Sequence, residues 1–104
     1  TVITYNAAIS ACEKGRQWKR ALELLDEMKA SGRVEPDVIT YNAAISANEK
    51  GGQWERALAL IEEMKRSGQI EPDVVSFSAA ISACGKGEQR ERALELLDEI
   101  GTRG

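Results

Sequence analysis

The strongest constraint on the fold of this chain is a unit of 36 residues that occurs twice nearly intact and a third time in part. The units begin at Val2, Val38 and Val74, and they span residues 2–37, 38–73 and 74–104. The first two are identical at 27 of their 36 positions, whereas the third is shorter and more divergent. A period between about 20 and 50 residues is typical of solenoids, in which each unit packs mainly on its neighbours. We therefore predict one helical-repeat domain over residues 1–104, as a segment of a longer array.

Each unit is predicted to form two helices. Apolar side chains recur at spacings of three and four, the pattern of an amphipathic helix, at Val2, Tyr5, Ala8, Ile9 and Cys12 and again at Trp18, Ala21, Leu22, Leu25 and Met28. Gly15 is expected to end the first helix, and Asp37 and Asp73, each after a proline, are expected to cap the helices that follow them. The expected fold is all-α: a right-handed α-solenoid of stacked antiparallel helix pairs, with three pairs and six helices.

Composition excludes several classes of function. No apolar run approaches the ~20 residues needed to cross a bilayer, so we expect no membrane insertion. The chain has no histidine, and its two cysteines occupy the same position of the first and third units. No metal site or cysteine–histidine nucleophile can be built from them. The many carboxylates follow helical faces, where they are most simply solvated. We expect no catalytic residue, no metal and no cofactor.

Four segments of the sequence resemble the pentatricopeptide repeat (PPR) family. They are "VITYN" at the start of the first helix, "RALELLDEM" and "RALALIEEM" in the second, and the "EPDV" connection. The resemblance implies an organellar protein, of chloroplast or mitochondrion, that binds single-stranded RNA in processing, stability, editing or translation. In such repeats each unit reads one base with two or three side chains.

The resemblance also implies which residues contact RNA. Base-reading residues occupy the fifth and last positions of each unit, which here are Asn6, Asp37, Asn42, Asp73 and Ser78. Residues that pack on base faces occupy the second position, which here are Ile3, Ile39 and Val75. Lysines near the RNA backbone occupy the thirteenth position, which here are Lys14, Lys50 and Lys86.

The chemistry of these side chains agrees with the implied roles. An asparagine amide offers both acceptor and donors to a pyrimidine edge, whereas serine is shorter and leaves room for a purine. Aspartate only accepts, and can orient a base donor or a water. In the family's code, asparagine with aspartate favours uracil, so the segment is predicted to read 5′-U-U-purine-3′.

Each of these residues also has a simpler interpretation. The asparagines could serve the first turn of a helix, the aspartates could only cap, and the lysines could only complement the helix dipole. Glu13 and Glu49 lie beside the asparagine line and would repel phosphate. Trp18 and Trp54 could stack on bases, but their place in the apolar stripe favours packing between helices.

Two further features bear on function. The unit has 36 residues where the family's usual unit has 35, with the extra residue near Arg33 and Gln69. The net charge of −3 argues against a mainly cationic RNA-binding surface. An alternative function is therefore a structural or scaffold subunit that binds protein partners in a larger organellar assembly.

Overall fold

The structure, a computed structural model, describes residues 1–103 and contains six helices and no strand within them. The helices are α1 (Val2–Lys14), α2 (Trp18–Ser31), α3 (Val38–Lys50), α4 (Trp54–Ser67), α5 (Val74–Lys86) and α6 (Arg90–Arg103). Each of the three units therefore forms one helix pair, which confirms the predicted all-α solenoid.

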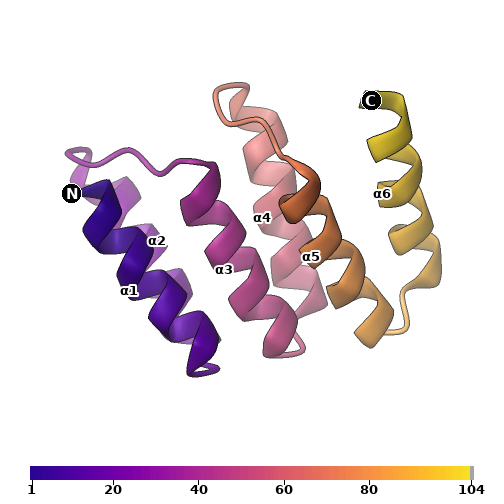
Figure 1. Cartoon of the computed structure of the whole chain (residues 1–104), viewed down its shortest axis with the longest axis horizontal. Coiled ribbons are helices and arrows are strands. Elements are labelled where there is room, and N and C mark those ends of the chain that lie inside the picture. Colours follow the sequence, from indigo (N-terminus) through magenta and orange to yellow (C-terminus); the bar gives the residue numbers. More distant parts are fainter. Residues whose placement is uncertain (104) are drawn as a thin grey trace.

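The first helices of the three units form one continuous layer. α1 packs on α3, and α3 packs on α5, while α2 and α4 each contact the first helix of their own unit and that of the next. Figure 1 shows α1, α3 and α5 side by side in front, with α2 and α4 behind them and the two chain ends at opposite ends of the long axis. This arrangement presents one outer face of α1, α3 and α5 to solvent.

Side-chain caps begin the first helices, as predicted for the aspartates. The Asp37 carboxylate accepts a hydrogen bond from the Thr40 backbone N–H at 3.0 Å, and Asp73 accepts one from the Ser76 N–H at 3.1 Å. Both form capping boxes, because the hydroxyl three residues later accepts from the backbone N–H of the aspartate. The second helices end instead at Gly32 and Gly68, whose left-handed φ values of 67° and 70° suit glycine.

The core lies between the helix layers and is most complete in the middle unit. Large side chains from both layers are almost fully buried there, among them Tyr41, Ile45, Ile61 and Met64. Alanines along α3 and α5 are also fully or almost fully buried, at Ala44, Ala47, Ala80 and Ala83. Because their side chains are small, the first helices can pack closely on one another.

Two tryptophans join neighbouring units. A Cβ atom built on Gly51 would lie 2.8 Å from Cγ of Trp18, and one on Gly87 would lie 2.6 Å from Cγ of Trp54. Each indole thus packs directly on the backbone at the end of the next unit's first helix. This confirms the packing interpretation of Trp18 and Trp54 over base stacking.

Ion pairs between second helices reinforce the stacking. Lys29 lies 2.7 Å from Glu63, and Lys65 lies 3.0 Å from Glu99. The Tyr41 hydroxyl also donates to Glu63, at 2.5 Å. The two lysine–glutamate pairs repeat with the unit and join unit one to unit two and unit two to unit three, whereas the tyrosine bond lies within unit two and Phe77 of unit three has no hydroxyl to repeat it.

The third unit lacks the residues through which the first two units contact the unit that follows them. Arg90 stands where the first two units have tryptophan, Gly101 where they have lysine, and Gly85 where they have glutamate. Leu94 and Leu97 of α6 are 55% and 57% exposed. The outer side of the third unit therefore differs chemically from the sides by which units one and two hold their neighbours.

Candidate nucleic-acid interface

The fifth residue of the first unit and its last residue meet in one hydrogen-bonded cluster. Asn6, in the first turns of α1, donates from Nδ2 to Oδ1 of Asp37 at 3.2 Å, although 31 residues separate them. Thr40, in the first turn of α3, has its hydroxyl oxygen 2.5 Å from Oδ1 of Asn6. The stacking of α1 on α3 therefore brings together two residues that the sequence predicts to read one base.

The second unit repeats this cluster. Asn42 donates from Nδ2 to Oδ1 of Asp73 at 3.0 Å, and the hydroxyl of Ser76 lies 2.5 Å from Oδ1 of Asn42. The extra residue in the 36-residue unit has thus not separated the aspartate from the asparagine. In the third unit Ser78 lies exposed at the equivalent position of α5, and the position equivalent to Asp37 falls beyond residue 104.

The hydrogen bonds keep both aspartates ionised. Burial alone would raise the pKa of Asp37, but hydrogen bonds from Thr40 and Asn6 outweigh it and lower the pKa below its usual value. Burial likewise opposes the lowering of the Asp73 pKa by hydrogen bonds from Ser76 and Asn42. Each cluster thus contains one carboxylate that only accepts, and the amide must turn its NH₂ toward it.

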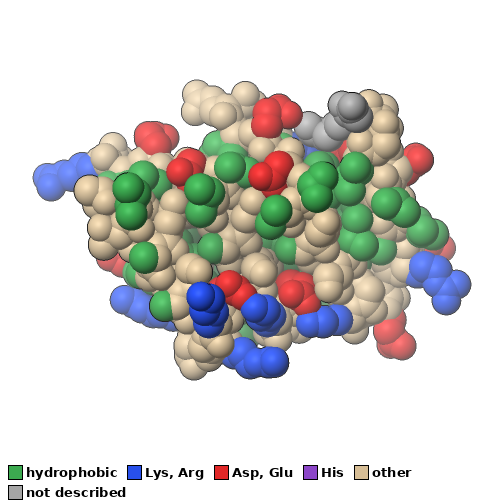
Figure 2. Space-filling view, in the orientation of Figure 1, with side chains coloured by type: hydrophobic (Ala, Val, Ile, Leu, Met, Phe, Trp, Pro, Cys, Tyr) green, Lys and Arg blue, Asp and Glu red, His purple; other side chains and the backbone are tan. Residues whose placement is uncertain are grey.

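Apolar side chains stand beside these clusters and face solvent. Ile3 is 78% exposed, Ile39 60% and Val75 56%. These positions make no contribution to the core, so packing does not explain why they are branched and apolar. Figure 2 shows a band of hydrophobic side chains, with acidic groups among them, across the face formed by α1, α3 and α5. Ile3, Ile39 and Val75 each precede the fifth residue of their unit by three positions on the same helix, so the two positions share a helix face.

The lysines near the ends of the first helices are largely paired with glutamates. Lys50 forms an ion pair with Glu13 of the preceding unit, and Lys86 forms one with Glu49. Lys14, at the end of α1, is exposed and has no ion pair within residues 1–103. Figure 2 shows this basic row along one edge of the face, with acidic groups between the basic ones. The lysine row is present, but two of its three charges are partly neutralised.

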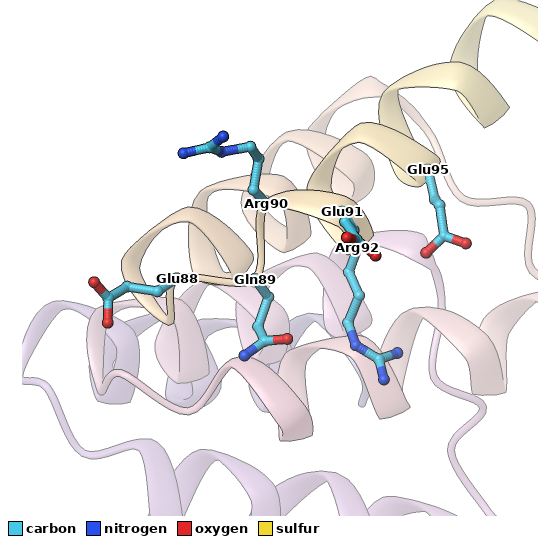
Figure 3. Close-up of a pocket in the computed structure, with 6 residues that line it drawn as sticks. All are labelled: Glu88, Gln89, Arg90, Glu91, Arg92 and Glu95. Atoms are coloured by element: carbon cyan, nitrogen blue, oxygen red, sulfur yellow. The ribbon is translucent and has the colours of Figure 1, made fainter.

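One hollow of the described structure lies away from these clusters. It has a volume of about 670 Å³ and is lined by Glu88, Gln89, Arg90, Glu91, Arg92 and Glu95, around the start of α6. In Figure 3 Arg90 points away from Arg92 and Glu95, so the charged groups do not converge on one point. Nor does any group of three metal-ligating side chains occur among the described residues. No helix of the described chain meets the length and hydropathy of a membrane span.

Sequence reasoning missed two parts of this site. It did not foresee that Thr40 and Ser76 contact the asparagine of the preceding unit, and it treated Glu13 and Glu49 as repulsive without foreseeing their pairing with lysines. The available signal was the period itself. A residue in the first turn of one unit must lie near the same turn of its neighbour once the units stack in register.

Comparisons with known proteins agree with the repeat and the fold. The sequence profile of the PPR repeat family matches residues 1–47 and 36–86, and that of the PPR repeat matches residues 75–104. A comparison with curated proteins gives no match. The crystal structure of the pentatricopeptide repeat protein PPR10 from maize superposes with a TM-score of 0.89 at 29% identity. A crystal structure of PPR10 in complex with an 18-nt psaJ RNA element superposes with a TM-score of 0.86, also at 29% identity.

The structural matches cover this chain and the PPR10 chains to different extents. Each PPR10 structure covers 100% of this chain, whereas this chain covers 15% of each PPR10 chain. Because the profile matches together run from residue 1 to residue 104, they account for all three units. The chain belongs to the pentatricopeptide repeat family.

Proposed function

We propose that this chain binds single-stranded RNA through the outer face of α1, α3 and α5, with one nucleotide for each unit. The observation that carries the proposal is the twofold occurrence of the same arrangement. Asn6 with Asp37 and Asn42 with Asp73 form matching polar clusters, each beside an exposed branched apolar residue. The likeness to PPR10, which has been crystallised with RNA, supports the same ligand class here.

Each unit offers a base two kinds of contact. An exposed Ile3 or Ile39 can pack on a base face, and the asparagine amide can bond to the base edge. Uracil has a carbonyl acceptor where cytosine has an amino donor, which allows one amide to distinguish them. The proposed sequence for this segment is 5′-U-U-purine-3′, in which Ser78 leaves room for the purine.

Electrostatics limit what three units can achieve alone. The chain has a net charge of −3, and Glu13 and Glu49 share the edge with the lysines. Aliphatic packing lacks the aromatic stacking that contributes ~1–3 kcal/mol per base. We therefore propose that the segment acts within a longer array, in organellar RNA processing, stability, editing or translation, and that it has no catalytic role.

The second candidate is a scaffold function with a protein partner. The paired glutamates on the lysine edge and the negative net charge favour it. Both functions use a solenoid face, but they differ in ligand and in the residues that the ligand touches.

A titration monitored by nuclear magnetic resonance distinguishes the two functions, because this method detects weak binding by a chain of 104 residues. The ¹⁵N-labelled chain is titrated at low salt with a short RNA containing UUG and with the same sequence as duplex. RNA binding is expected to shift the side-chain amides of Asn6 and Asn42 and the backbone of Ile3, Ile39 and Val75, with the duplex weaker. Absence of any shift at millimolar RNA would leave the protein-partner function.

A further inference from the structure

In the second and third units a buried hydroxyl touches the base-reading amide of the unit before it. Thr40 is fully buried, and its Oγ1 lies 2.5 Å from Oδ1 of Asn6 and 2.9 Å from Oδ1 of Asp37. Ser76 is also fully buried, and its Oγ lies 2.5 Å from Oδ1 of Asn42. Neither hydroxyl faces the outer surface, so neither can itself contact a nucleotide.

The protons of the cluster can be assigned from its donors and acceptors. The Thr40 hydroxyl accepts from the Asp37 backbone N–H at 3.0 Å, and it has one proton to give. The Asp37 carboxylate oxygen already receives the Asn6 amide and the Thr40 backbone N–H. The hydroxyl proton therefore goes to the closer acceptor, Oδ1 of Asn6.

Two contacts disfavour the opposite orientation of the Asn6 amide. Turning the Asn6 amide over would place its oxygen against the Asp37 carboxylate, with the loss of a charge-assisted hydrogen bond. It would also place the NH₂ group at the hydroxyl, so the short hydrogen bond from Thr40 to the amide oxygen would be lost and the hydroxyl proton would have to turn to the Asp37 carboxylate. Aspartate and hydroxyl together hold a single orientation, in which one N–H of the amide remains uncommitted.

We propose that Thr40 and Ser76 are positioning residues for nucleotide selection by Asn6 and Asn42. By holding the amide oxygen, each hydroxyl makes the asparagine present a donor to the base, which fits the O4 carbonyl of uracil and opposes the N4 amino group of cytosine. Without the hydroxyl only the aspartate opposes the turned amide, which would present its oxygen to cytosine. This inference rests on the proposed RNA-binding function.

The first unit provides a matched control. Thr4 occupies the position of Thr40, and its hydroxyl lies 3.1 Å from that of Thr1, the N-cap residue of α1. Among the described residues the Thr4 hydroxyl bonds that of Thr1 and no asparagine amide. Thr4→Val thus removes the hydroxyl at the same position of a unit without touching a base-reading amide.

The test compares Thr40→Val, Thr40→Ser, Ser76→Ala and Thr4→Val with the wild-type chain. Each is titrated with RNAs containing UUG, CUG or UCG. Thr40→Val is expected to weaken the preference for uracil at the first nucleotide only, and Ser76→Ala at the second only. We expect the ratio of Kd values to change about fivefold, which corresponds to one net hydrogen bond. Thr40→Ser and Thr4→Val should keep both preferences.

A second measurement needs no RNA. In the free wild-type chain the side-chain NH₂ resonances of Asn6 and Asn42 are expected to be dispersed and slow to exchange. In Thr40→Val the NH₂ resonances of Asn6 alone should lose this dispersion and slow exchange, whereas Thr40→Ser and Thr4→Val should retain both properties. A folded Thr40→Val chain with an unchanged Asn6 amide, or with unchanged uracil preference, would overturn the positioning role. Failure of every variant and of the wild type to bind RNA would instead refute the proposed function, and the free-chain resonances would still decide the positioning role.

Discussion

The indole ring of Trp18 lies against the backbone of Gly51, at the contact between the first unit and the second. A Cβ at Gly51 would come within 2.8 Å of Trp18 Cγ, although its φ of −83° is open to any residue. Glycine is therefore required at this position by the neighbouring ring and not by the backbone conformation. The same relationship recurs between Trp54 and Gly87.

Gly51→Ala is expected to destabilise the chain by about 1–3 kcal/mol, because the ring must move out of a packed site. Gly15→Ala is the control, since Gly15 has nearly the same backbone angles and a Cβ there would meet only Ala11 O at 3.3 Å outside its own loop neighbours. Urea unfolding measures both. Equal effects of the two substitutions, or an unchanged cost of Gly51→Ala in a Trp18→Ala background, would contradict the proposed contact.

The middle unit has a buried polar group where the other two have cysteine. Asn48 is fully buried, and its Nδ2 donates to Ala44 O at 2.8 Å, but its Oδ1 has no hydrogen-bond partner. An unsatisfied buried acceptor costs about 1–3 kcal/mol. Asn48→Cys is thus expected to raise the free energy of unfolding by that order, and Cys84→Asn to lower it. The account of this site fails if Asn48→Cys destabilises the chain in urea under reducing conditions.

The lowered pKa of Asp37 predicts a stability that depends on acid pH. The group is ionised in the folded state to a lower pH than in the unfolded state, where its pKa is about 4. Its contribution is complete above that value and is lost as the pH falls through the folded pKa. Asp37→Asn keeps a good N-cap residue but removes this term, so the urea midpoint should fall less between pH 5 and pH 2. The exposed Asp98→Asn controls for the change of charge; the interpretation is wrong if Asp37→Asn steepens the fall.

RNA affinity is expected to rise if two ion pairs are removed, those of Lys50 with Glu13 and of Lys86 with Glu49. Glu13→Gln with Glu49→Gln releases both lysines to contact phosphate and removes two negative charges from the same edge. RNA affinity is expected to rise about tenfold at low salt, and the gain should shrink as salt screens it. Glu23→Gln with Glu55→Gln makes the same change of charge on α2 and α4. An equal gain from that pair would show that net charge alone governs binding.

Much of the fold could be predicted because it follows from residues that recur in the repeated unit. Two helices per unit, the aspartate caps and the packing role of Trp18 follow from spacing within a single unit, where local patterns are informative. Stacking in register then follows from the need of each pair to bury its apolar faces. Because the units are alike, the helix pattern of one unit predicts the whole layer of first helices.

Other features could not be predicted, because they depend on how side chains from different units meet. The pairing of Lys50 with Glu13 joins residues 37 apart, and the contact of Thr40 with Asn6 joins residues 34 apart. Neither shows in the periodicity of one helix. The requirement for glycine at Gly51 is similar: the sequence indicates a helix end, but only the structure shows the indole that excludes a side chain.

The most direct test of base reading is to exchange the asparagine of the second unit for the serine of the third. Asn42→Ser is titrated with RNAs that differ only at the second nucleotide, uracil or guanine, and circular dichroism confirms that the variant is folded. The account predicts that the preference at this nucleotide moves from uracil toward guanine, while the preference at the first nucleotide, read by Asn6, is unchanged. A folded variant whose preference at the second nucleotide remains the same would contradict it.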